Sequence, residues 1–179
     1  MAGLWPAGWD RLAAATGRRD VLMLTLAMPG ALQRAADAIR GRLAPEAAAR
    51  APAHLGLFRH LPGAELAAIA RDLRMVAAQP APQFGIGWPE RWDGLWVAPV
   101  SGEGPMRLRD QLADRWHGLL AAPDLGHPRL HVSLSRGAEA PPPLPGGPWT
   151  AQGLLLWRHP GHQCDRACWT PLVACRFRR

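Results

Sequence analysis

The chain has 179 residues, 48% of them hydrophobic, which is enough to bury one substantial core in a single domain. Its formal net charge is +7 and every basic side chain except histidine is arginine, so an anionic partner such as nucleic acid is favoured. A compositional bias of the coding genome explains the absence of lysine equally well. No apolar run approaches the ~20 residues of a membrane span, no signal peptide is evident, and three cysteines near the C-terminus make no secreted disulfide framework. We therefore expect a cytoplasmic protein, monomeric and not associated with a membrane.

Hydrophobic periodicity and turn residues predict alternating strands and helices in a domain over residues 20–179, preceded by an N-terminal arm over residues 1–19. Short apolar runs bounded by Pro and Gly predict strands, and apolar residues at helical spacing predict amphipathic helices. The predicted elements are, in chain order, a strand over 21–28, a helix over 31–43, a connector over 45–52, a strand over 53–58, a helix over 64–75, an irregular strand and loop over 79–94, a strand over 95–100, a helix over 105–120, a strand over 129–135, a loop over 137–148, a strand over 150–158 and a strand over 169–178.

Two of these strands carry nearly the same six residues, HLGLFR at 54–59 and HVSLSR at 131–136. Both runs begin with His, have Leu at the fourth place and end in Arg. The order strand, helix, His-bearing strand therefore occurs twice, which indicates a duplicated α+β unit. If the two copies pack about a pseudo-twofold axis, both imidazoles face one cleft.

The alternation of side chains along a strand predicts which residues share a face with each histidine. In the first copy His54 lies with Gly56 and Phe58, and in the second copy His131 lies with Ser133. Two imidazoles on a common face are what acid–base chemistry on a phosphodiester needs, because histidine takes up and releases protons near neutral pH.

Arginines follow both motifs at an odd offset from the histidine. Arg59 and Arg136 stand five places after their histidines, so an ideal strand turns them away from the imidazole. They reach a bound phosphate only if the strand ends or bulges there, and otherwise they are solvated residues at a strand end. Phe58 is placed on the histidine face, where it could stack a nucleobase, whereas His60 is expected to be a structural hydrogen-bonding residue. Three tryptophans of predicted loops could also stack a base: Trp88, Trp92 and Trp149.

The C-terminal run HPGHQCDRACW offers a competing site, with four candidate zinc ligands within ten residues. The ligand types suit a Cys₂His₂ zinc site, but the cramped spacing matches no zinc pattern, so we expect neither metal nor cofactor. A zinc-stabilised interaction module remains the weakest alternative. The four residues are His159, His162, Cys164 and Cys168.

Paired His-x-[Thr/Ser]-hydrophobic strands in a duplicated α+β chain resemble the 2H phosphoesterase superfamily, and most nearly its 2′-5′ RNA ligase-like (cyclic phosphodiesterase) family. The resemblance covers about residues 20–179 and includes the runs FRHLPG at 58–63 and GLLLWR at 153–158. It implies a duplicated, two-lobed α+β fold, with two small antiparallel sheets around a central cleft and helices on the outside.

The same resemblance implies metal-independent opening of 2′,3′-cyclic phosphates, or making or breaking of 2′-5′ linkages, in RNA or nucleotides. His54 and His131 would be the general acid and base, in an order that the sequence leaves open, and Ser133 would donate a hydrogen bond to a phosphate oxygen. Gly56 departs from the family pattern, which has Thr or Ser there, and losing one such donor typically costs ~10²–10³ in rate. The alternative is therefore an RNA- or nucleotide-binding protein of the same fold with weak or no catalysis.

Overall fold

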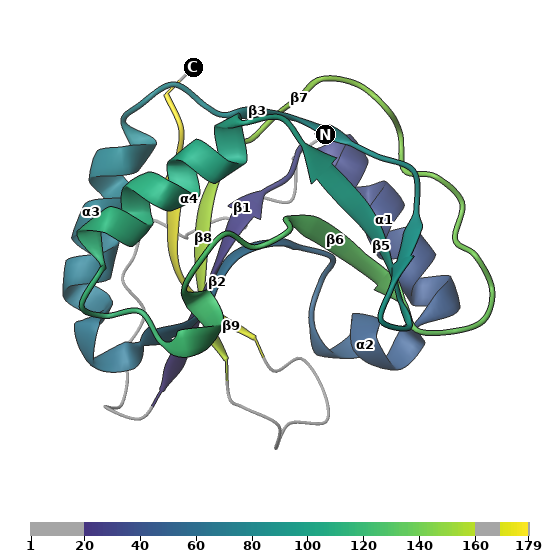
Figure 1. The fold of residues 1–179 in the computed structure, drawn as a ribbon, viewed down its shortest axis with the longest axis horizontal. Helices are drawn as coiled ribbons and strands as arrows, with labels where there is room; N and C mark the ends of the chain where they lie inside the picture. The colour runs from purple at the N-terminus through teal and green to yellow at the C-terminus, as the bar shows by residue number, and fades with distance from the viewer. Residues whose placement is uncertain (1–19, 160–168, 179) are drawn as a thin grey trace.

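The computed structural model describes residues 20–159 and 169–178 (Figure 1). The expected N-terminal arm over 1–19 lies outside these residues. The α-helices are α1 (Gly30–Leu43), α2 (Pro45–Arg50), α3 (Leu66–Ala77) and α4 (Gly104–Arg115), and the short 3-10 helices are η1 (Gly63–Glu65) and η2 (Ala122–Asp124). The strands are β1 (Val21–Ala27), β2 (Leu55–Pro62), β3 (Gln83–Ile86), β4 (Glu90–Trp92), β5 (Leu95–Ser101), β6 (His131–Ser135), β7 (Trp149–Thr150), β8 (Gly153–His159) and β9 (Thr170–Arg176).

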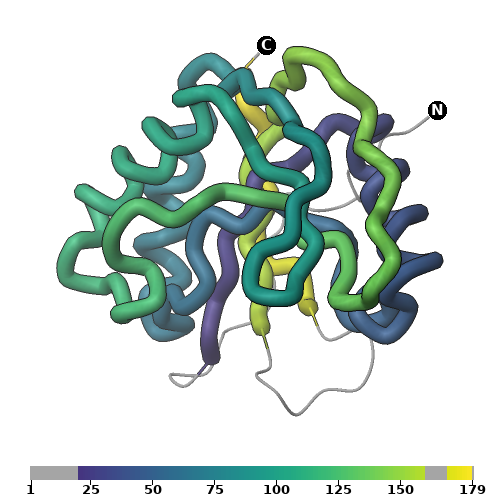
Figure 2. Tube along the Cα trace, turned by 45° about the vertical axis from the view of Figure 1, so that its right-hand side comes forward, coloured from purple at the N-terminus to yellow at the C-terminus, as the bar shows by residue number. Residues whose placement is uncertain are grey.

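The predicted repeat is confirmed, because the order strand, helix, His-bearing strand occurs as β1–α1–β2 and again as β5–α4–β6. Two local differences concern the ends of elements. The expected connector at 45–52 contains α2, which begins at Pro45, a residue whose fixed φ suits the first turn of a helix. His54 lies immediately before β2 and not within it. The segment 137–148 has no regular secondary structure, as expected, and runs beside α1, where Glu139 pairs with Arg42 (Figure 2).

The described strands pair antiparallel in one sheet with the order β7-β3-β5-β6-β2-β1-β8-β9, and β4 pairs with β5 along the same edge as β3. One half of this sheet contains β2, β1, β8 and β9, and the other contains β6, β5, β4, β3 and β7. The two halves meet between β2 and β6, where Leu55 pairs with Val132. The two small sheets expected from the sequence are therefore joined edge to edge as halves of one curled sheet.

Helices cover the sheet on two sides, with α3 and α4 on the left of Figure 1 and α1 and α2 on the right. The helix of each repeat packs against the His-bearing strand of the other repeat. From α1 the buried Arg40 donates to the Ser133 carbonyl of β6 at 3.2 Å. From α4 the buried Arg109 lies over the Phe58 ring of β2, 4.9 Å from its centroid. The two units are therefore interlocked by crossed helices.

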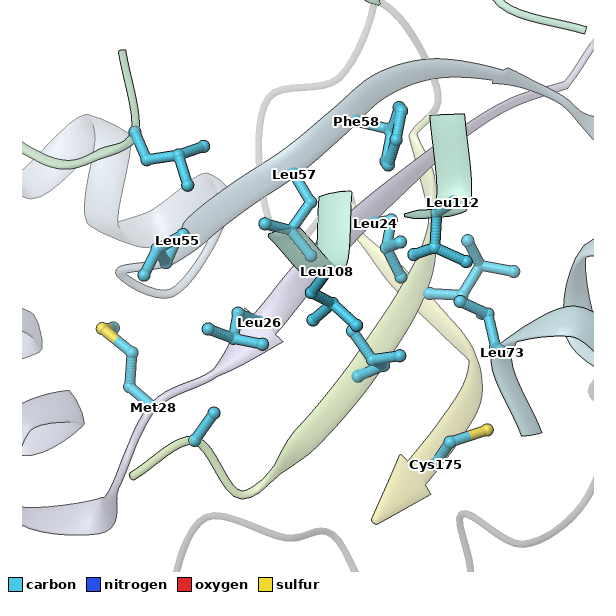
Figure 3. Close-up of a cluster of buried hydrophobic side chains, with 14 of the residues drawn as sticks. Leu24, Leu26, Met28, Leu55, Leu57, Phe58, Leu73, Leu108, Leu112 and Cys175 are labelled. Atoms are coloured by element: carbon cyan, nitrogen blue, oxygen red, sulfur yellow. The ribbon is translucent and has the colours of Figure 1, made fainter. Parts of the chain in front are cut away.

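Leucines of the central strands form the core between the sheet and α3 and α4 (Figure 3). Leu24 of β1 and Leu57 of β2 are buried there, and Leu108 and Leu112, one helical turn apart on α4, cover them. Each fully buried leucine contributes about 1.5–3 kcal/mol of hydrophobic stabilisation. The strand that follows His54 is thus anchored on its apolar face. Among the described helices, none is both long enough and apolar enough to cross a membrane.

Candidate active site

The two histidine motifs meet at a cleft of about 290 Å³ between β2 and β6. His54 and His131 both line this cleft, and each is half-buried. Gly56 and Ser133, two places further along their strands, line it as well. The prediction that both imidazoles face one cleft is confirmed. Three arginines supply positive charge to the lining: Arg59, Arg109 and Arg129.

Both imidazoles are held in the same way by the backbone two residues upstream. Nδ1 of His54 lies 2.9 Å from the carbonyl oxygen of Pro52, and Nδ1 of His131 lies 2.8 Å from that of Arg129. A carbonyl oxygen only accepts hydrogen bonds, so each neutral ring carries its proton on Nδ1 and keeps Nε2 as the basic atom. The site therefore holds two imidazoles of the same tautomer in matching orientations.

An aromatic ring from a different element packs against each imidazole. The ring centroids of Trp169, just before β9, and His54 are 4.5 Å apart, and those of Trp92 of β4 and His131 are 5.3 Å apart. The guanidinium of Arg129 stacks on Trp92 at 3.7 Å from its centroid. Trp92 was among the tryptophans proposed from the sequence as stacking residues, whereas Trp169 carries no sequence signal that links it to His54.

The surroundings lower the pKa of both histidines. Burial, with added repulsion from Arg40, Arg59 and His131, lowers the pKa of His54 to about 4 and outweighs its hydrogen bond with Pro52. Burial, followed by repulsion from Arg59 and Arg129, also lowers the pKa of His131 below its usual value of 6.5. Both rings are therefore neutral at neutral pH, and a bound anion would favour protonation by offsetting the arginine charges.

A bulge in β2 changes which side chains reach the cleft. Thr25 of β1 pairs with Gly56 but the next residue, Leu24, pairs with Phe58, so one step on β1 matches two on β2. Phe58 is consequently fully buried, edge-on to Trp116 at 5.2 Å. The expectation that Phe58 lies on the histidine face and stacks a base is wrong, because the bulge reverses the alternation after Gly56.

The same bulge brings Arg59 into the cleft lining, where its charge acts on both histidines. Arg136, the corresponding residue of the second repeat, has a different environment. It follows the end of β6, is exposed, and lines a separate cavity of about 530 Å³ together with Arg40 and Ala44. The structure thus brings Arg59 together with the histidines and places Arg136 outside the cleft.

The residues after each histidine differ in the donors that they offer. Ser133, which carries a hydroxyl, lines the cleft, whereas Gly56 at the matching place has no side chain. A Cβ atom built on Gly56 would lie 3.1 Å from the terminal methyl carbon of Met23, a buried residue of β1 that also lines the cleft. Met23 therefore packs against the place where a first-motif hydroxyl would begin, and the cleft is apolar on that side.

The competing metal site falls largely outside the described residues. Of its four candidate ligands, His159 is described and lies 5.8 Å from the Trp169 ring, while His162, Cys164 and Cys168 are in the segment that is not described. Within residues 20–159 and 169–178 there is no group of three or more His, Cys, Asp or Glu side chains that could hold a metal ion.

A duplicated α+β chain with two histidine strands facing one cleft has the architecture of a 2H phosphoesterase. The family model of the 2′-5′ RNA ligase superfamily matches residues 28–159, and the chain belongs to that superfamily. No curated protein sequence is significantly similar to it.

Solved structures of this fold are similar over nearly the whole chain. TT0787 of Thermus thermophilus is 20% identical with a TM-score of 0.64, and the match covers 89% of this chain and 100% of that one. E. coli LigT complexed with NADP+ is 16% identical with a TM-score of 0.63, covering 91% and 100%. E. coli LigT complexed with 3′-AMP is 18% identical with a TM-score of 0.61, covering 89% and 99%. At these identities the similarity establishes the fold.

Proposed function

We propose that the protein is a metal-independent phosphodiesterase that opens 2′,3′-cyclic phosphates, or makes or breaks 2′-5′ linkages, in RNA or nucleotides. The observation that carries the proposal is the pair of imidazoles, His54 and His131, each held through Nδ1 at the wall of one arginine-lined cleft. Matched groups of this kind can take and give a proton on opposite sides of a phosphorus atom.

In the hydrolytic direction, Nε2 of one neutral imidazole removes a proton from the attacking water as the water oxygen bonds to phosphorus. The other imidazole, protonated when the anionic substrate is bound, gives its proton to the leaving ribose oxygen as the bond from phosphorus to that oxygen breaks. The product is a phosphomonoester, and the two imidazoles have exchanged protonation states. Ser133 and Arg59 donate to the non-bridging phosphate oxygens, where negative charge increases in the transition state.

A nucleotide or an RNA end is the substrate class that the cleft supports. The stacked pair of Trp92 and Arg129 stands beside His131 and offers a planar surface for a base next to the phosphate position. Solved structures of E. coli LigT contain 3′-AMP, ATP or NADP+, and these are nucleotides bound by a protein of the same fold.

Gly56 supports a second candidate function, namely a nucleotide- or RNA-binding protein with weak or no catalysis. In that case the arginines and Ser133 still bind the phosphate, but the first repeat supplies too little stabilisation of the transition state. The two candidates differ in turnover and not in ligand.

The test is turnover of nucleoside 2′,3′-cyclic monophosphates and of a short RNA ending in a cyclic phosphate, with EDTA present. We expect His54→Ala and His131→Ala each to reduce the rate by ~10²–10⁴-fold. His60→Ala is the matched control, since this exposed histidine of β2 does not line the cleft, and its rate should stay close to that of the wild type. Binding of these ligands without turnover in any variant would favour the second candidate.

A further inference from the structure

We infer that Asp124 is a positioning residue that holds Arg59 in the cleft, where Arg59 acts in place of the hydroxyl missing at Gly56. The inference rests on the proposed function. Asp124 ends η2 and is buried, with 4% of its surface exposed. Its Oδ1 accepts the backbone N–H of Arg59 at 2.8 Å, and its Oδ2 accepts that N–H at 3.0 Å and the N–H of His60 at 2.7 Å.

The bulge in β2 explains why these two N–H groups need an acceptor outside the sheet. The regular pairing of β2 with β1 is interrupted between Phe58, opposite Leu24, and Leu61, opposite Leu22. Arg59 and His60 fall in this interruption, and backbone donors that lack a ladder partner cost free energy unless something else accepts them. A carboxylate is a strong acceptor for such donors, so Asp124 favours the bulged conformation that turns Arg59 towards the cleft.

The second repeat has a similar irregularity but a different outcome. On β5 and β6, Val97 pairs with Ser133 and the next residue, Trp96, pairs with Ser135, so the register also slips after the motif. β6 then ends, and Arg136 lies outside the cleft. The hydroxyl is present in this repeat and the arginine is directed elsewhere, which is the reverse of the first repeat.

Each repeat therefore contributes one phosphate donor to the cleft. The second repeat contributes the Ser133 hydroxyl, and the first contributes the Arg59 guanidinium, beside the bare backbone of Gly56. Arg59 can serve there because its charge already reaches both histidines. The departure from the family pattern at Gly56 is thus compatible with catalysis in this chain.

Because Asp124 is negatively charged, the direction in which Asp124→Asn changes phosphate affinity tests the inference. Asp124 lines the cleft, so its negative charge alone would oppose the binding of an anion. If Asp124 were merely a nearby charge, Asp124→Asn would strengthen phosphate binding. If it positions Arg59, Asp124→Asn weakens phosphate binding, because an amide offers the two N–H groups one uncharged acceptor instead of a carboxylate.

The experiment measures the affinity of the full-length protein for inorganic phosphate and for adenosine 2′,3′-cyclic monophosphate, by titration calorimetry, and turnover of the latter. The variants are Arg59→Ala, Asp124→Asn and the double variant. Asp110→Asn is the control, because Asp110 lies 3.6 Å from Arg109 and its removal neutralises a carboxylate near the cleft without touching β2. Circular dichroism checks that each variant is folded.

We expect Arg59→Ala to weaken phosphate binding about tenfold or more, the loss of one charge-assisted hydrogen bond. Asp124→Asn should weaken it about three- to tenfold, and the double variant should bind no more weakly than Arg59→Ala alone, since Asp124 acts through Arg59. Asp110→Asn should bind as the wild type does or slightly more tightly.

The inference is overturned if Asp124→Asn binds phosphate more tightly, if the losses of Arg59→Ala and Asp124→Asn add in the double variant, or if the wild type binds no phosphate. Failure of the proposed function has a different result. It would leave the coupling between Asp124 and Arg59 visible in the phosphate titrations, with no turnover of the cyclic nucleotide in any form.

Discussion

Replacing Trp169 by alanine should raise the pKa of His54 from about 4 towards the ordinary value of 6.5. The indole lies 4.5 Å from the imidazole, and burial is the largest cause of the lowered pKa, so its removal admits water to the ring. The whole shift, 6.5 minus 4, corresponds to about 3 kcal/mol. Repulsion from Arg40, Arg59 and His131 remains in the variant, so we expect the pKa to rise only part of the way, by about one pH unit, or about 1 kcal/mol.

The lowered pKa also makes stability depend on pH. The neutral imidazole is favoured in the folded state, so the unfolded chain takes up the proton first as the pH falls. The free energy of unfolding should therefore decrease between about pH 6.5 and pH 4, by up to about 3 kcal/mol from His54. His54→Gln, which cannot titrate, should lose less stability over the same pH range. Trp169→Ala should be less stable than the wild type at pH 7, and its further loss of stability on acidification should lie between those of the wild type and His54→Gln.

NMR titration of the imidazole C–H protons measures the pKa directly, with the His54→Gln spectrum used to assign the signal. Urea unfolding at pH 7 and pH 4.5 measures the linked stability. A His54 signal that titrates near pH 6.5 in the wild type would refute the desolvation argument. So would a Trp169→Ala variant in which the His54 pKa stays near 4.

Three further predictions concern the cleft and the bulge. Gly56→Thr should fold, because the 3.1 Å contact of its Cβ atom is with the flexible end of Met23. It should raise turnover only a few-fold, because Arg59 already donates to the phosphate there, whereas restoring a donor that nothing replaces would raise it ~10²-fold. Initial rates with a cyclic nucleotide test this, and a gain of about 100-fold would contradict the role of Arg59. Phe58→Ala should cost about 3–5 kcal/mol in urea unfolding, as expected for a fully buried ring; unchanged stability with weakened nucleotide binding would instead place Phe58 at the ligand. Arg136→Ala should leave phosphate affinity within about twofold of wild type, while Arg59→Ala weakens it at least tenfold. The opposite ranking in a phosphate titration would contradict the conclusion that the bulge brings Arg59 into the cleft and that Arg136 lies outside it.

The sequence predicted the repeat, the order of elements and the meeting of His54 and His131, because periodicity and a repeated motif depend on residues close together in the chain. It could not locate the bulge after Gly56. The register of β2 depends on its pairing with β1 and on Asp124, which is 65 residues away from Arg59. Regular alternation of side chains along an ideal strand therefore predicted that Phe58 faces the cleft and that Arg59 points away from it, which is the reverse of what the structure shows.

Other parts of the site arise from contacts that cross the molecule. Arg109 lies in a helix whose apolar stripe was predicted, but its place over Phe58 follows from α4 crossing to the other repeat. Trp169 meets His54 although β9 and β2 are the opposite edges of one sheet half, with β1 and β8 between them. Contacts of this kind have no local pattern in the sequence, so only the assembled fold could place Arg109 in the cleft lining and Trp169 against His54.

The crossed helices bear on how such a chain could have arisen. A lone unit of strand, helix and histidine strand would leave its helix without the strand that the helix covers, and its histidine strand without a cover. Two copies that exchanged helices would satisfy both needs and would already form the complete cleft. This arrangement is the one that a domain-swapped homodimer would have if a linker joined its two protomers. In a fused chain the two halves can differ, as they do here at Gly56 and Ser133, which a symmetric homodimer does not allow.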